Sequence, residues 1–385
     1  MRRIKMGMVG GGEGAFIGAV HRIAANIDGQ IELVCGAFSS TAERSLASGQ
    51  ALHLPEERCY PDFDTMMNCE AALPEWERMD FVAIVTPNHL HFPVAKSALE
   101  KGFHVMSDKP ATFSVQEAVE LRELVKATGL LYGLTHTYTG YPLVKEARQR
   151  VAAGELGKIR KVVVEYSQGW LAGREEDEDN KQADWRLDPE RSGVSSCMGD
   201  IGVHAANLAE YVCGLKITEM CAELTSFVEG RTLDDDGSIL LRFNNGARGV
   251  LMASQISVGE ENALRIRAYG EHGSLEWSQQ EPNSLWLKWS DKPTQMLRTS
   301  GGYLSEYADA NSRTPGGHPE GYLEAFANHY RNFAAQISAR MNNSAINAIA
   351  NDLPGIDEAV RGMAFIEHCV KASASDQKWH SLPEY

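Results

Sequence analysis

The sequence of 385 residues lacks any uninterrupted apolar stretch of the ~18 residues that a membrane-spanning helix needs. Its first residues, MRRIKMGMVGGG, include basic side chains but no apolar segment behind them, so they do not have the form of a signal peptide. Basic residues are also few, because 37 Lys and Arg face 52 Asp and Glu and leave a formal net charge of −15. A surface that acidic repels phosphate backbones and anionic lipids, and we therefore expect no nucleic-acid partner and no membrane partner.

Cysteine is scarce and irregularly placed. The seven cysteines form no Cys-x-x-Cys pair and no other zinc-like spacing, so we expect reduced thiols, no metal centre and a cytoplasmic location. Apolar residues make up 43% of the chain and charged residues 23%, which is ordinary for a globular protein and sufficient for a sizeable core.

The first third of the chain alternates short apolar runs with helical patterns. Apolar runs bounded by turn-forming residues are typical of strands buried on both faces. After the last of these runs, Ser114 and Glu117 form a capping box for a helix that Gly129 ends. This alternation predicts an α/β fold with a doubly wound parallel sheet. The predicted strands are Ile4–Val9, Ile31–Ala37, Phe81–Val85 and His104–Ser107.

The pattern changes after residue 137. Strand-like segments follow one another, and Asn245-Gly246 between two of them predicts a type I′ hairpin turn, so this part should hold a large, mainly antiparallel open sheet. Helical patterns return over 320–340 and 356–371, and the acidic run Glu175–Asp179 is expected to be a solvated loop. At roughly 100–200 residues per domain, we expect an α/β domain over 1–137 and an α+β domain over 138–385. The predicted strands are Lys161–Trp170, Met220–Val228, Ser238–Phe243, Gly249–Ile256, Leu264–Tyr269 and Leu285–Trp289.

A glycine-rich loop follows the first predicted strand and precedes a helix. Glycines at this place let the backbone approach a pyrophosphate, at which the first N–H groups of the helix point. An ordinary glycine-rich turn is the alternative. The third small residue of the motif is either Ala15, at the usual spacing, or Gly18, which implies a three-residue insertion. The residues predicted to contact a dinucleotide are Gly10, Gly12, Glu13, Gly14, Ala15, Phe16 and Ile17.

The second predicted strand ends without the carboxylate that binds the adenosine ribose of NAD. Ser39 and Ser40 follow it instead, with Arg44 in the next turn. Two hydroxyls and a guanidinium can bind a 2′-phosphate, which favours NADP over NAD while leaving both open. The alternative is that Ser40 or Thr41 caps the next helix and Arg44 is solvated.

Polar residues follow the third and fourth strands at the carboxyl edge, where α/β sheets bind ligands. We expect cofactor contacts from Thr86, Asn88 and His91. Lys109 leaves the fourth strand at the same edge, where an ammonium can contact the cofactor and share a hydrogen bond with a substrate hydroxyl. A surface lysine in a turn is the alternative.

A second candidate cluster opens a predicted helix at Gly199–His204. Asp200 and His204 are four residues apart, so both can point into one cleft, where a carboxylate that orients an imidazole is a common acid–base arrangement. The alternative is an N-capping Asp200 and a core histidine.

Four segments together resemble the glucose–fructose oxidoreductase/inositol dehydrogenase (Gfo/Idh/MocA) family: VGGGEGAFIGAVHR, TPNHLHFPVAKSAL, DKPAT and GDIGVHAANLAEYVCG. The resemblance covers both predicted domains. It implies an N-terminal Rossmann domain, a C-terminal sheet that forms homodimers or homotetramers, and NAD(P)-dependent oxidation or reduction of sugars, cyclitols or related polyols. It also implies that Lys109, Asp200 and His204 are catalytic. The chain departs from the family pattern at Asp108, which replaces a glutamate, at Asn207, which replaces a second aspartate, and in its longer glycine loop.

Further residues are candidates for contacts with the substrate. Indole faces stack on sugar C–H surfaces, and Arg or His donates to hydroxyls, although core or interface roles are open for each position. With Lys109, Asp200 and His204, these candidates are His136, Tyr138, Trp170, Trp185, Arg186 and His318.

Two other functions remain alternatives to a dehydrogenase. One is a glycosidase that keeps NAD bound and works by transient oxidation and elimination. The other is a non-catalytic ligand sensor, against which the joint presence of Lys109, Asp200 and His204 argues.

Overall fold

The computed structural model describes residues 2–177 and 180–385, which form two compact units. Unit 1 comprises Met1–Thr137 and Phe326–Val360, and unit 2 comprises Tyr138–Ala325 and Arg361–Tyr385. In this described part of the chain, no helix combines the length and the apolar character that crossing a bilayer requires.

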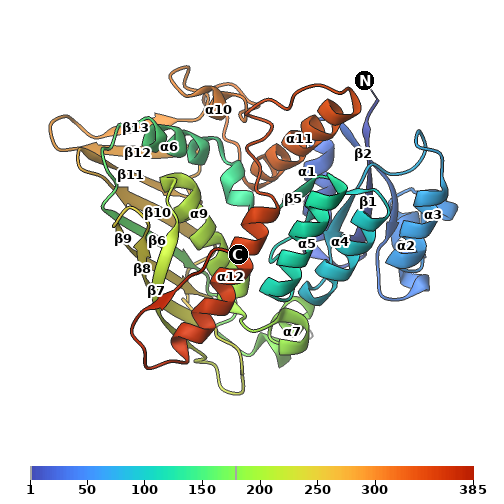
Figure 1. Cartoon of the computed structure of the whole chain (residues 1–385), viewed down its shortest axis with the longest axis horizontal. Helices are drawn as coiled ribbons and strands as arrows, with labels where there is room; N and C mark the ends of the chain where they lie inside the picture. Colours follow the sequence, from blue (N-terminus) through green and yellow to red (C-terminus); the bar gives the residue numbers. More distant parts are fainter. Residues whose placement is uncertain (1, 178–179) are drawn as a thin grey trace. The chain divides into compact units, whose positions relative to one another are not determined.

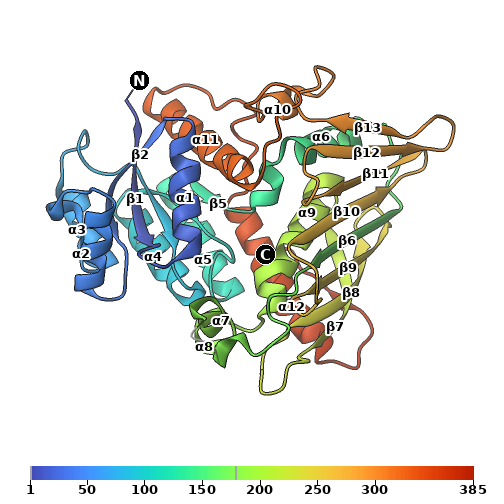
Figure 2. The same cartoon turned by 180° about the vertical axis from the view of Figure 1, so that it is seen from behind.

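Unit 1 is built on a five-stranded parallel sheet of order β2-β1-β3-β4-β5. Figure 1 shows α4 and α5 in front of this sheet, and Figure 2 shows α1 in front of its other face. The predicted doubly wound Rossmann sheet is thereby confirmed. The strands are β1 (Ile4–Gly10), β2 (Ile31–Ala37), β3 (Phe81–Val85), β4 (His104–Ser107) and β5 (Tyr132–Leu134), and the helices are α1 (Phe16–Ile27), α2 (Ala42–Ala51), α3 (Phe63–Ala72), α4 (His91–Glu100) and α5 (Val115–Thr128).

Burial on both faces explains why the strands of unit 1 are nearly continuous apolar runs. Every residue of β3 is buried, and Val82 and Ile84 pack with Val94 of α4 and Leu121 of α5. The order of the strands reverses direction at β1, between β2 and β3, and such a switch point leaves a crevice for ligands outside the carboxyl ends of the strands.

Residues 326–360, which the sequence places in the second domain, pack within unit 1. They include most of α11 (Tyr322–Met341) and the start of α12 (Ile356–Ser373). The helical spacing of the aromatic residues in α11 correctly indicates a buried face, but the face packs on the parallel sheet. The ring of Phe333 stands edge-on to that of Phe81 in β3, with centroids 5.3 Å apart.

Unit 2 contains a nine-stranded sheet of order β13-β12-β11-β10-β6-β9-β8-β7-β14. All its pairs are antiparallel except β6 with β9, which confirms the predicted, mainly antiparallel sheet. The strands are β6 (Lys161–Ser167), β7 (Ile217–Thr225), β8 (Asp236–Phe243), β9 (Arg248–Ser254), β10 (Ala263–Tyr269), β11 (Gly273–Ser278), β12 (Ser284–Trp289), β13 (Gln295–Arg298) and β14 (His380–Ser381), and the helices that lie wholly in unit 2 are α6 (Pro142–Ala152), α7 (Lys181–Arg186), α8 (Pro189–Ser192), α9 (Val203–Cys213) and α10 (Glu306–Asp309).

The strands of unit 2 alternate between buried and exposed residues because helices pack on one face of the sheet, as Figure 2 shows for α9. The other face carries ion pairs and the exposed side chains of Leu240, Tyr269 and Trp286.

The hairpin between β8 and β9 is present, but its turn is not of type I′. Gly246 adopts a φ of +90°, whereas Asn245 does not have the positive φ that a type I′ turn requires of both central residues. The N–H of Gly246 donates to Phe243 O at 2.9 Å, which describes a tight turn followed by a left-handed glycine.

Candidate active site

The glycine loop lies at the end of β1, next to the switch point of the sheet. Gly10, Gly11 and Gly14 have φ values of 84°, 72° and 79°, which favour glycine. A Cβ on Gly12 would stand 2.7 Å from Phe38 O and 2.8 Å from Ser48 Oγ, so a larger residue would displace the loop. Ala15 precedes α1 and provides no side-chain cap, which leaves the first N–H groups of the helix open to a ligand. These residues fit a dinucleotide pyrophosphate.

Gly18, and not Ala15, provides the close packing of helix on loop. A Cβ on Gly18 would lie 2.3 Å from Gly11 Cα and 2.7 Å from Gly11 O. Helix α1 begins only at Phe16, so the loop is longer than the usual motif, and Gly18 lies in the first turn of the helix. The three-residue insertion is therefore the correct alternative, and the exposed Glu13 and Gly14 lie within it.

The end of β2 bears directly on the choice of cofactor. Phe38 is buried, Ser40 and Arg44 are exposed, and Thr41 caps α2 by accepting the N–H of Arg44 at 3.4 Å. The capping alternative therefore holds for Thr41. It does not conflict with a role for Ser39, Ser40 and the side chain of Arg44 in binding a phosphate.

His91 joins two loops at the carboxyl edge of the sheet of unit 1. Its Nδ1 lies 2.6 Å from Pro110 O, and its Nε2 lies 2.9 Å from Thr86 O. The residue is buried, and burial lowers the pKa of its imidazole. Both ring nitrogens thus face main-chain carbonyl oxygens, and His91 fixes the Thr86 loop, with the buried Asn88, relative to the Lys109 loop.

Lys109 is the second residue of the loop after β4, and the side chain of Asp108, the first residue, shapes the backbone of this loop. Asp108 Oδ1 accepts the N–H of Lys109 at 2.8 Å and the hydroxyl of Thr135 at 2.7 Å. His136 is buried, and burial, with a smaller contribution from the charge of Lys109, lowers the pKa of its imidazole to about 3. His136 is therefore a neutral neighbour of Lys109 and is unsuited to act as a base near neutral pH.

In unit 2, the predicted pair Asp200 and His204 lies at the junction of a π-helical turn (Met198–Gly202) and α9. Single π-helical turns occur frequently at functional sites because they change the direction of the side chains they carry. Asp200 lies inside this turn, so the alternative of a plain N-cap is wrong. Its Oδ2 accepts from Gln255 Nε2 at 2.9 Å and from Arg186 Nε at 3.3 Å.

Aromatic side chains surround His204, which is only 8% exposed. Its ring stands edge-on to Tyr138, with centroids 5.0 Å apart. The hydroxyls of Tyr138 and Tyr166 are hydrogen-bonded to each other, and Asn262 donates to Tyr138 at 3.3 Å. Burial raises the pKa of both phenols, so the hydroxyls of Tyr138 and Tyr166 stay protonated at neutral pH.

The structure brings three more of the predicted substrate residues together beside Asp200. The guanidinium of Arg186 lies 4.3 Å from the ring centroid of Trp185 and 6.0 Å from that of Trp170. Since Arg186 also contacts Asp200, these residues form one cluster of aromatic faces and donors. The remaining candidate, His318, lies in an exposed loop where its Nδ1 lies 3.1 Å from Pro315 O, and the described residues give it no contact with this cluster.

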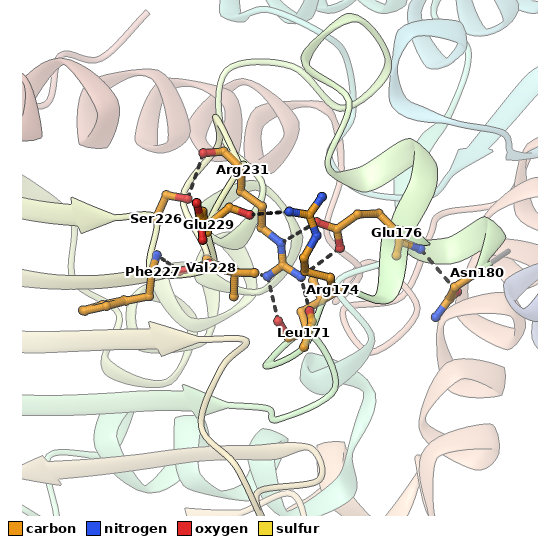
Figure 3. Close-up of polar contacts among 12 residues, drawn as sticks. Leu171, Arg174, Glu176, Asn180, Ser226, Phe227, Val228, Glu229 and Arg231 are labelled. Carbon is orange, nitrogen blue, oxygen red and sulfur yellow. Dashed lines mark hydrogen bonds and ion pairs between the residues drawn. The ribbon is translucent and has the colours of Figure 1, made fainter. Parts of the chain in front are cut away.

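Arg231 anchors the segment that leads to this cluster (Figure 3). Its guanidinium is 1% exposed and donates to Leu171 O, Gly173 O, both carboxylate oxygens of Glu176, and Asp235. Glu176 is thus held in a half-buried ion pair, and the expectation of a solvated loop over Glu175–Asp179 is wrong at this residue; residues 178 and 179 lie outside the described residues. Leu171, Gly173 and Glu176 lie 55 to 60 residues before Arg231 in the sequence, and no local pattern indicates these contacts.

The comparisons with known proteins cover both units. Residues 4–136 match the family model "Oxidoreductase family, NAD-binding Rossmann fold", and residues 144–276 match "GFO/IDH/MocA C-terminal domain". The oxidoreductase YfiI of Bacillus subtilis is 34% identical over 381 residues, which cover 98% of this chain and 96% of the relative.

Two solved structures are similar over almost their entire lengths. An oxidoreductase from Sinorhizobium meliloti is 43% identical with a TM-score of 0.89, covering 99% of this chain and 100% of that one. An inositol dehydrogenase homologue from Azotobacter vinelandii, complexed with NADH and myo-inositol, is 34% identical with a TM-score of 0.91, covering 99% of this chain and 98% of that one.

Proposed function

The chain belongs to the GFO/IDH/MocA family of NAD-binding oxidoreductases, and from this we propose that it is a dehydrogenase of a sugar, a cyclitol or a related polyol. NAD(P), when bound, supplies the acceptor or donor of hydride. The observation that carries the proposal is that Asp200, in a π-helical turn, lies beside Arg186 and its indole neighbours, while His204, in the first turn of α9, lies against Tyr138, in a chain that also has a dinucleotide loop. Aromatic faces beside charged donors suit a ligand with C–H surfaces and hydroxyls.

We assign the proton chemistry to His204. A carbinol that loses hydride must also lose its hydroxyl proton, and an imidazole can accept that proton near neutral pH. Asp200, which Arg186 and Gln255 orient, is assigned to hold the substrate or a catalytic partner. Lys109 is assigned to stabilise the negative charge that develops on the substrate oxygen. The presence of Lys109, Asp200 and His204 in one chain favours an enzyme over a non-catalytic sensor.

Contacts with the cofactor are assigned to the glycine loop with Phe16 and Ile17, and to Ser39, Ser40, Arg44, Thr86, Asn88 and His91. We favour NADP over NAD because Ser39 and Ser40, and no carboxylate, stand where the strand β2 ends, and Arg44 is exposed in the first turn of α2. Since the Azotobacter homologue was crystallised with NADH and myo-inositol, cyclitols should be assayed first, with NAD and with NADP.

The proposal is tested with a panel of cyclitols, aldoses, anhydrosugars and uronates, each assayed with NAD and NADP for reduced cofactor. We expect net formation of NADH or NADPH with at least one polyol. His204→Asn should then lower turnover roughly 10²–10⁴-fold while folding and cofactor binding persist. The control is His272→Asn, an exposed histidine of unit 2, which should be fully active.

Two results would contradict the assignment. Near-normal turnover of a folded His204→Asn variant would exclude His204 as the base. Cleavage of glycosides without net reduced cofactor would identify the alternative, a glycosidase that retains NAD.

We also propose that the open face of the unit 2 sheet forms a homodimer or homotetramer. Leu240, Tyr269 and Trp286 are exposed on this face, beside charged pairs that can be matched by a second copy. Light scattering after size-exclusion chromatography should give two or four times 42.3 kDa, and a monomer would refute this.

A further inference from the structure

A histidine that the catalytic assignment does not use lies at the centre of unit 1. His21 is on α1, and its side chain is completely buried. Its Nδ1 lies 2.6 Å from the hydroxyl of Tyr330 on α11, and its ring stands edge-on to Phe326 with centroids 4.6 Å apart. Two helices therefore fix the plane of this imidazole.

The free edge of the imidazole faces Asp108, the residue before Lys109. His21 Nε2 lies 4.0 Å from Asp108 Oδ2 and has no hydrogen-bond partner among the described residues. If the proton were on Nδ1, the Nε2 lone pair would face a carboxylate, which is unfavourable. The favourable arrangement has Tyr330 donating to Nδ1 and the ring proton on Nε2, where it points at Asp108.

Asp108 is the link between this imidazole and Lys109. Its Oδ1 already accepts the main-chain N–H of Lys109 and the hydroxyl of Thr135, so Oδ2 is the oxygen left to face His21. The orientation of the carboxylate determines both contacts at once.

We propose that His21 is a positioning residue for Lys109, in which the Nε2–H of a ring held by Tyr330 attracts Asp108 Oδ2 and so fixes the turn from which the Lys109 side chain begins. The inference rests on the proposed function, since it supposes that Lys109 acts in the reaction. His21 itself touches neither substrate nor cofactor in this assignment.

The charge state of the ring is consistent with this role. Burial lowers the pKa of His21 to about 4, against an opposing effect of Asp108, and the nearby titratable groups that contribute are Asp108, Arg22 and His91. Burial also raises the pKa of Tyr330, so its hydroxyl retains the proton it donates. The pair is therefore a fixed dipole at neutral pH.

The first measurement needs no activity. In cofactor-free protein labelled with ¹⁵N at histidine, His21 should give the signals of a neutral ring protonated at Nε2, assigned by their loss in His21→Gln. These signals should shift in Asp108→Asn, and in Tyr330→Phe the preference for Nε2–H should weaken. A ring protonated at Nδ1, or no response to Asp108→Asn, would overturn the proposal whatever reaction the protein catalyses.

The second measurement uses the best substrate of the polyol panel. His21→Leu should lower kcat about tenfold with KM and cofactor affinity nearly unchanged, and His21→Gln, which retains a donor, should restore most of it. In the Asp108→Asn background His21→Leu should add little, because its effect passes through Asp108. An unchanged kcat in folded His21→Leu would refute the positioning role, and so would a loss of kcat in the double variant that equals the sum of the losses from His21→Leu and Asp108→Asn. If His21→Leu does not fold, kcat of Tyr330→Phe provides the same test of the role. Absence of turnover with every polyol would refute the proposed function, while the spectra would still decide the contact.

Discussion

The packing of Gly18 on Gly11 makes a sharp prediction about Gly18→Ala, which adds one methyl group to the first turn of α1. That methyl carbon would stand 2.3 Å from Gly11 Cα, whereas ordinary contact begins at 3.4 Å, so helix and loop must separate by about 1.1 Å. The three nearest atoms all belong to the Gly11 backbone, so no side-chain rotation can relieve the contact.

Overpacking of this kind costs about 1–3 kcal/mol. The separation moves the glycine loop away from the N-terminus of α1, and these two elements must act together on a pyrophosphate. If the whole cost falls on the complex, the affinity for NADH or NADPH decreases roughly fivefold to 150-fold. Fluorescence titration of the reduced cofactor measures this directly, with circular dichroism to verify the fold.

The matched control is Gly321→Ala in unit 2. An added Cβ there meets only Glu324 Oε2, at 3.8 Å, so the same chemical change creates no clash. Its cofactor affinity should equal that of the parent protein. Unchanged affinity in a folded Gly18→Ala protein would show that the close packing of helix and loop is irrelevant to the cofactor, and would refute this placement.

Three further predictions address cofactor choice, stability and pH. Arg44→Ala should weaken NADP roughly tenfold to hundredfold more than NAD, since a charge-assisted contact is worth about 1.5–3 kcal/mol; equal losses in titrations of both cofactors would make Arg44 structural. Arg231→Met leaves the buried carboxylate of Asp235 without its cationic partner and should destabilise unit 2 by about 3–5 kcal/mol in urea unfolding, and an unchanged midpoint would contradict the anchoring role. Burial lowers the pKa of His104 to about 4, so below pH 6.5 the unfolded chain binds a proton that the folded chain does not. Stability should therefore fall between pH 6.5 and pH 4, by on the order of 3 kcal/mol for this group. His104→Gln should flatten the fall in denaturation curves, and an identical pH profile would argue against a buried neutral ring.

Much of unit 1 is predictable from local sequence because its strands are buried on both faces. The bounds predicted for Ile31–Ala37, Phe81–Val85 and His104–Ser107 are those observed, and Ser114 caps α5 as its capping box indicates. Strand β5 was not predicted, because its three residues, Tyr132–Leu134, are too few to show a period.

Contacts between distant segments could not be predicted from pattern. Asp200 and His204 are four residues apart and were found by spacing, but Gln255 and Tyr166 come from separate strands or loops. The same limit applies to Gly18, because only the distance to Gly11 distinguishes it from Ala15. Asn245-Gly246 shows that a dipeptide can indicate a hairpin correctly and its turn type incorrectly.

The return of residues 326–360 to unit 1 has a consequence for how the protein is made. The two segments of unit 1 are separated by the 188 residues of Tyr138–Ala325. At 5–20 residues per second, synthesis of that interval takes about 10–40 s. During this time the side of the parallel sheet at Phe81 lacks the helix whose Phe333 covers it, while the strands β6 to β13 are being synthesised. The cofactor-binding unit therefore begins synthesis first but can be completed only after nearly all of the other, and a nascent chain halted at residue 137 presents an apolar sheet face that chaperones would recognise.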